Sequence, residues 1–187
     1  MDKSVPAFLD LEPNILKHPV FGELQKKRYA DVLRADFESK IVGCVNRYAS
    51  LPALIVHEGE YRKLLIEARN IFTYGYFYSC VAMCGISAER ILKDVFVARF
   101  SVVSKGQTMP PNAKSKKALE SFTAKSICDF LTAAGFFDTA LQQHFAKLAS
   151  LRNKYAHGGG KNAETDAREA IHHLHAIVQG TVSIQNV

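Results

Sequence analysis

The residue types best suited to chemistry lie together near the C-terminal end of the sequence. Arg152, Asn153 and His157 follow one another within a single short segment, and three glycines come directly after His157. An imidazole with a pKa near about 6.5 can transfer protons at neutral pH. A guanidinium can stabilise negative charge that develops during a reaction. The segment therefore offers a proton-transfer group and a charge-stabilising group close together.

Helical geometry puts these side chains on different faces. At about 100° per residue, Arg152 shares a sector with the apolar Leu148 and Tyr155 and lies about 140° from His157. Asn153 is four residues before His157 and shares its face. The glycines offer left-handed conformations that end a helix. We therefore expect Arg152 on the core stripe and His157 at an exposed helix end.

A charge on the core stripe needs a partner, because an unpaired buried charge is very costly. Glu89 lies inside a long apolar segment, flanked on its face by Ala82, Gly85 and Phe96. It needs a partner as well. An ion pair between Arg152 and Glu89 on adjacent helices satisfies both needs, and a purely structural role for this pair is the alternative to a catalytic one.

The elements that position these residues are all predicted to be helical, and no segment has a strand pattern. Apolar spacing predicts helices over about 21–50, 58–72, 76–100, 119–134, 138–157 and 163–182. The third is apolar on most sides, which places it at the centre of a bundle. Residues 1–20 read as a surface arm and 101–117 as a long loop. The prediction is an all-α bundle of about five to six helices with an N-terminal extension, divided into 1–57 and 58–187.

The net charge of +6 is concentrated in one stretch. Residues 101–125 carry five lysines and one glutamate. A lysine cluster attracts polyanions such as RNA through counterion release, and a solvated loop kept soluble by lysine is the alternative. The candidate RNA-binding residues are Lys105, Lys114, Lys116, Lys117 and Lys154.

The cysteines and histidines predict neither a disulfide nor a metal site. Cys80 and Cys84 are one helical turn apart and fit core positions, and the sequence contains no C-x-x-C. His172 and His175 are also one turn apart, with no nearby cysteine or carboxylate to complete a ligand set. The sequence has no apolar run of about 20 residues and starts without the basic and apolar blocks of a secretory signal. We therefore expect reduced cysteines, no membrane contact and a cytoplasmic location.

The segment Arg152-Asn153-x-x-x-His157, late in a helical bundle, resembles the R-N-x-x-x-H motif of the HEPN superfamily. Two further segments resemble the paired core helices of that family. One is the stretch 68–78, which contains a Gly-aromatic turn, and the other is the long apolar helix in which Glu89 precedes Ile91-Leu92-Lys93. The resemblance covers roughly residues 58–184.

This resemblance implies a metal-independent endoribonuclease of bacterial defence or toxin–antitoxin type, working without a cofactor. Such proteins act as dimers in which the Arg–His motifs of both subunits face one cleft. Arg152 and His157 would be catalytic, with Asn153 and Glu89 in support. The partners implied are RNA, a second copy, and an antitoxin or defence-system protein. Since RNA supplies its own nucleophile, the 2′-hydroxyl, the expected products carry a 2′,3′-cyclic phosphate and a 5′-hydroxyl.

Two features keep alternatives open. Toxins of the family that pair with a minimal nucleotidyltransferase often have Tyr two residues after the His, where this sequence has Gly159. The family also contains non-catalytic modules that bind a nucleotide or a partner protein. On that reading Asn153 is a polar surface residue and His157 interacts only with the helix dipole.

Overall fold

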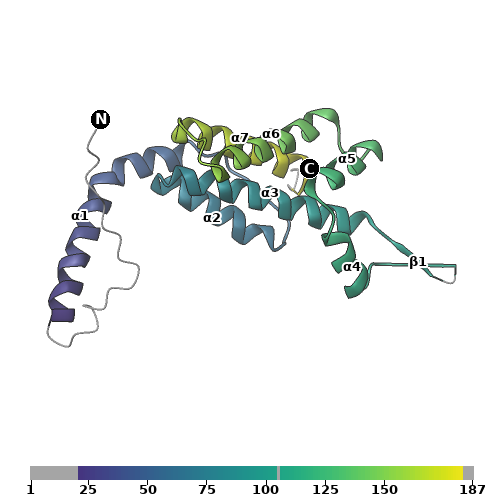
Figure 1. Cartoon of the computed structure of the whole chain (residues 1–187), viewed down its shortest axis with the longest axis horizontal. Coiled ribbons are helices and arrows are strands. Elements are labelled where there is room, and N and C mark those ends of the chain that lie inside the picture. The colour runs from purple at the N-terminus through teal and green to yellow at the C-terminus, as the bar shows by residue number, and fades with distance from the viewer. Residues whose placement is uncertain (1–20, 105, 183–187) are drawn as a thin grey trace. The chain divides into compact units, whose positions relative to one another are not determined.

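The structure of the chain is a computed structural model that describes residues 21–104 and 106–182 (Figure 1). Seven α-helices and one two-stranded hairpin lie within these residues. The all-α class predicted from the sequence is therefore confirmed, with a few strand residues that were not predicted. The chain divides into two compact units that meet between Val42 and Gly43, inside the first helix. The predicted boundary at 57/58 lies within the second unit.

The first unit contains most of α1, which spans Phe21–Ala49. Its large apolar side chains are exposed along the length of the helix rather than packed into a core: Leu24, Tyr29, Val32, Leu33, Phe37, Ile41 and Val42. Salt bridges one turn apart support the helix surface, as between Lys40 and Asp36 at 2.7 Å.

The second unit is a helical bundle built around α3. Its helices are α2 (Tyr61–Tyr74), α3 (Phe77–Arg99), α4 (Ala113–Glu120), α5 (Ala124–Ala133), α6 (Thr139–Ala156) and α7 (Ala163–Thr181). Helix α3 packs against α2, α4, α5, α6 and α7, which confirms its predicted central place. Cys80, Val81, Cys84 and Ile91 on this helix are fully buried, so the two cysteines are core residues as expected.

The predicted long loop over 101–117 is wrong. Strand β1 (Val102–Ser104) pairs antiparallel with β2 (Gln107–Met109) and forms a hairpin that extends outward near α4 (Figure 1). Gly106 has a φ of 76° at its turn, a conformation that glycine adopts without strain. Alternation over three residues is too short for a strand pattern to stand out in the sequence.

The predicted helix over 119–134 starts later, as α5 at Ala124, and a separate short helix, α4, occupies Ala113–Glu120, mostly within the predicted loop. Asn112 starts α4, where its Oδ1 accepts a hydrogen bond from the backbone N–H of Ser115 at 3.0 Å. Thr123 then starts α5, where its Oγ1 accepts from the N–H of Ser126 at 3.2 Å. Each cap satisfies a backbone donor that would otherwise be unpaired at a helix start. No described helix is both long and apolar enough to cross a membrane.

Candidate active site

Helix α6 carries most of the candidate site, and both of its ends are fixed by local interactions. Asp138 Oδ1 accepts a hydrogen bond from the N–H of Leu141 at 2.7 Å at the start of the helix. At the other end, Gly158 adopts a φ of 72° and the N–H of Gly159 donates to the carbonyl of Lys154 at 2.9 Å. The predicted glycine stop is confirmed, and His157 is the last residue before the chain turns away.

The predicted pairing of α6 with α3 is confirmed. Arg152 Nη1 lies 3.0 Å from Glu89 Oε2, and Lys93 Nζ lies 3.1 Å from Glu89 Oε1. Burial acts to raise the pKa of Glu89, but the hydrogen bonds and charges of Lys93 and Arg152 outweigh burial and lower that pKa below its usual value. Glu89 is therefore an ionised anchor that holds the guanidinium in place.

Glycine allows α6 to approach α3 closely at this point. A Cβ at Gly85 would lie 2.6 Å from Cδ of Arg152 and 3.1 Å from its Cβ. The arginine stem therefore fills the space over Gly85. The side chains of Arg152 and Glu89 are 39% and 34% exposed, so the expected burial of this pair is only partial.

A pocket of about 690 Å³ opens beside this ion pair, between α3, α5 and α6. Leu92, Phe145 and Leu148 line its apolar inner part and are buried in the core. Its polar lining includes the ion pair and the side chains Lys125, Asp129, Gln142, Gln143 and Asn153. Arg152, Asn153 and Glu89 are thus brought together at one pocket.

His157 is the candidate residue that does not line this pocket. Its side chain is exposed, and the described part of the chain offers its imidazole no hydrogen-bond or ion-pair partner. Five residues of helix correspond to about 7.5 Å along the axis, so His157 lies beyond Arg152 and around the helix from it. Within one chain, the side chains of Arg152 and His157 are therefore close together but point to different sides of α6.

A network that was not predicted from the sequence fixes the turn after His157. The carboxylate of Asp166 on α7 is buried and accepts hydrogen bonds from Lys154 Nζ at 2.6 Å and from the Tyr155 hydroxyl at 2.7 Å. The Tyr78 hydroxyl donates to the carbonyl of Gly160 at 2.5 Å, and its ring meets that of Tyr155 edge-on.

The electrostatics of this network follow from its hydrogen bonds. Those from Lys154 and Tyr155 lower the pKa of Asp166, against the effect of burial. Burial and the neighbouring carboxylate raise the pKa of Tyr155. A tyrosine hydroxyl on a core stripe needs a buried partner, and this was the signal in the sequence that could have identified Asp166.

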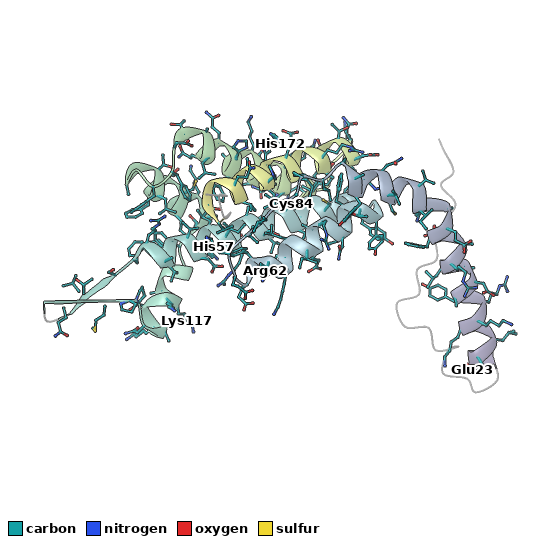
Figure 2. All side chains as sticks on the ribbon, turned by 180° about the vertical axis from the view of Figure 1, so that it is seen from behind. Glu23, His57, Arg62, Cys84, Lys117 and His172 are labelled. Carbon is teal, nitrogen blue, oxygen red and sulfur yellow. The ribbon has the colours of Figure 1, made fainter. Side chains whose placement is uncertain are left out.

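The lysines predicted to bind RNA fall into separate places. Lys114, Lys116 and Lys117 lie on α4, next to the hairpin, and Figure 2 shows Lys117 there. Lys154 is paired with Asp166, although its side chain is 41% exposed. Lys105 lies outside the described residues.

The histidines of α7 form a cluster with α6 instead of a metal site. Nδ1 of the buried His173 lies 2.9 Å from Nδ1 of His144, so one ring donates and the other accepts. Glu169 Oε1 lies 3.4 Å from Nε2 of His173, and His172 is exposed on the surface (Figure 2). Within 21–104 and 106–182, no three His, Cys, Asp or Glu side chains are arranged to hold a metal ion.

No protein-family model, curated protein or solved structure matches this chain.

Proposed function

We propose that the chain is a HEPN-like endoribonuclease of bacterial defence or toxin–antitoxin type, which cleaves RNA through Arg152 and His157 and requires no metal. The observation that carries the proposal is the arrangement at the end of α6. There Arg152 is anchored by Glu89 at 3.0 Å beside an open pocket, and an exposed His157 ends the same helix five residues further on.

The proposed chemistry uses the nucleophile of the substrate. The imidazole of His157 takes the proton of the 2′-hydroxyl, and the 2′-oxygen attacks the adjacent phosphorus. The bond from phosphorus to the 5′-oxygen then breaks. Arg152 stabilises the charge on the phosphate oxygens. The products are a 2′,3′-cyclic phosphate and a 5′-hydroxyl.

The leaving 5′-oxygen needs a proton, and each chain supplies one histidine at this place. We propose a homodimer in which His157 of a second copy provides that proton. The separation of Arg152 and His157 around α6 supports this arrangement, because two copies facing one another can bring an arginine and a histidine to the same phosphate. Light scattering is expected to give a dimer, and a monomer at high micromolar concentration would contradict the shared site.

The lysines of α4 are proposed to hold the RNA backbone. Lys114, Lys116 and Lys117 lie beside a projecting hairpin, and the chain carries a net charge of +6. Such a cation cluster binds phosphate without reading sequence. An antitoxin or other defence-system protein is the further partner of the proposal. The four cysteines are unpaired, which fits the proposed cytoplasmic location.

The second candidate is a non-catalytic module that binds a nucleotide or a partner protein. The pocket of about 690 Å³ favours it, because an apolar interior with a few polar groups at one side is typical of ligand sites. On this reading Arg152 holds a phosphate or carboxylate and His157 has no chemical role.

One assay separates the two. Purified protein is incubated with total RNA in EDTA, beside His157→Ala and the control His57→Ala. His57 is an exposed histidine in the segment before α2 (Figure 2), so the control removes an imidazole from a different surface. The nuclease proposal expects cleavage by the parent and by His57→Ala but not by His157→Ala. Absence of cleavage by the parent, or cleavage by His157→Ala, favours the binding module.

A further inference from the structure

The pocket between α3, α5 and α6 has a chemical character that the proposed reaction does not explain. Ala88 on α3 and Ala146 and Ala149 on α6 contribute to its lining, so small side chains leave the space open. Ala146 and Ala149 are exposed, so the pocket is open to solvent along α6. The apolar interior also offers water few hydrogen-bond partners. The pocket is therefore suited to an apolar group with a polar edge.

The polar side of the pocket presents hydrogen-bond acceptors from a hydrogen-bonded pair, the half-buried Gln142 and the exposed Asp129. Gln142 Nε2 lies 3.0 Å from Asp129 Oδ1. Since an ionised carboxylate only accepts, the amide of Gln142 must use its NH2 group in this interaction. Its carbonyl oxygen and the second oxygen of Asp129 are then the acceptors that remain for a ligand. A ligand edge that carries N–H donors matches this pair.

Arg152 adds an anion-binding group to the same pocket. Its Nη1 is used by Glu89 at 3.0 Å, while a guanidinium carries five N–H donors. Its side chain is 39% exposed, so donors remain for a phosphate at the mouth of the pocket. Lys125 lines the same pocket and is also exposed.

We infer that this pocket binds one unstacked nucleobase of single-stranded RNA, preferring guanine, with the neighbouring phosphate on Arg152. Among the four bases, guanine presents two adjacent donors, N1–H and N2–H, on its Watson–Crick edge, which match the oxygens of Asp129 and Gln142. Uracil presents a single N–H flanked by two carbonyl oxygens, which a carboxylate repels. Bases that are stacked in a duplex cannot enter, and single-stranded segments are where proteins read RNA bases. This inference rests on the proposed function, since it names the substrate of the same site.

The test measures binding of two fluorescent ten-residue RNAs by anisotropy. One is oligouridine and the other carries a single central guanosine. The parent is expected to bind the guanosine RNA at least about five-fold more tightly, the lower end of what a bidentate base interaction contributes. Asp129→Asn replaces an acceptor with a donor and is expected to remove this preference. Asp31→Asn, an exposed aspartate of α1, is the matched control and is expected to keep it.

A second variant tests the space itself. Ala149 is exposed and lines the pocket, so Ala149→Phe fills the pocket without disturbing the core. The guanosine preference is expected to disappear, while Ala140→Phe at an exposed position of α6 outside the pocket keeps it.

The outcomes separate the two proposals. Equal binding of both RNAs by the parent, or a preference that survives in Asp129→Asn, overturns the base pocket even if His157-dependent cleavage is found. A preference that Asp129→Asn removes supports the pocket even if no RNA is cleaved, and then only the nuclease proposal fails.

Discussion

Gly85→Ala changes the position of Arg152 without changing any charge, and its effects on stability and on activity are expected to differ. The added methyl would lie 2.6 Å from Cδ, 3.0 Å from Cγ and 3.1 Å from Cβ of Arg152. Overlap with Cβ and Cγ cannot be relieved by moving the end of the side chain alone. Rotation of the stem relieves the overlap with Cγ and Cδ, while the overlap with Cβ requires α6 to shift away from α3 by a few tenths of an ångström. Both movements displace the ion pair that joins Arg152 to Glu89 at 3.0 Å.

The effect on stability is the balance of two opposing contributions. Alanine in place of glycine inside a helix stabilises by about 1 kcal/mol. Breaking an ion pair that is more than a third exposed costs about 0.2–1 kcal/mol, and the displaced stem packs less well. Shifting α6 away from α3 costs about 1–3 kcal/mol more, so the net change is a loss of about 0–3 kcal/mol. Since about 1 kcal/mol shifts the melting temperature of a domain of this size by roughly 2–4 °C, Gly85→Ala should melt no more than roughly 12 °C below the parent.

The activity should fall much more. If Arg152 acts on the phosphate, a displacement of about 1 Å can reduce the rate by about 100-fold. The measurements are thermal melts by circular dichroism and cleavage of a labelled RNA. Gly43→Ala is the matched control, because the three atoms nearest to its methyl belong to the flexible guanidinium end of Arg47, the closest at 3.1 Å. If Gly85→Ala melts as high as Gly43→Ala and cleaves like the parent, Arg152 does not pack over Gly85 and the reasoning is wrong.

Four further results are expected. In denaturant titrations, Arg152→Ala should lose about 1–2 kcal/mol of unfolding free energy and His157→Ala less than about 1 kcal/mol. Both variants should lose cleavage, and equal changes in stability would refute the different placement of the two residues. Replacing the three α4 lysines with glutamine should reduce the slope of log binding constant against log salt by about 0.7–0.9 for each phosphate that is no longer neutralised, and an unchanged slope would remove α4 from the RNA interface. Tyr155→Phe should lower the unfolding free energy by about 1–3 kcal/mol at pH 7, because buried Asp166 loses a hydrogen-bond donor. This loss should become smaller below about pH 4 as Asp166 protonates, and a loss that is independent of pH would contradict the hydrogen bond. Burial lowers the pKa of His173, so this residue binds fewer protons in the folded protein than in the unfolded chain. Stability should therefore fall as the pH drops below about 6.5. His173→Gln should weaken this pH dependence in thermal melts between pH 7.5 and 5.5, and an unaltered dependence would assign it to other groups.

The helices and the ion pair could be predicted because each depends on a strong local signal. Gly158 follows the last periodic residue of α6 and ends it, and Asp138 precedes the first. Arg152 and Glu89 were paired by a single argument, that charges on apolar faces need partners. This argument works because few charges lie on such faces, so the number of candidate pairs is small.

The remaining features depend on tertiary packing that local sequence does not encode. The hairpin over 102–109 has strands of three residues, which are too short for a periodic signal. Asp166 lies in the first turn of α7, where an acidic side chain favours the helix dipole, and only the packing of α7 on α6 shows that it is buried and bonded to Tyr155. The interaction between His144 and His173 likewise depends on how two distant helices are placed.

The pocket was not predictable for the same reason. Small residues such as Ala88 and Ala149 occur in many helices, and a pocket arises only where the small residues of two helices meet. The acceptor character of Gln142 depends on its hydrogen bond with Asp129, thirteen residues earlier on another helix.

Identification of the RNA ends tests the central claim most directly. Two forms of an RNA that the protein cleaves are compared, one all-ribose and one with a 2′-deoxy nucleotide before the cleaved bond. Both are incubated with the protein in EDTA, and their products are analysed by mass spectrometry. The account predicts a 2′,3′-cyclic phosphate and a 5′-hydroxyl from the all-ribose RNA, no cleavage at the deoxy position, and no cleavage of either by His157→Ala. Cleavage at the deoxy position, or cyclic phosphate formed equally by His157→Ala, would contradict it.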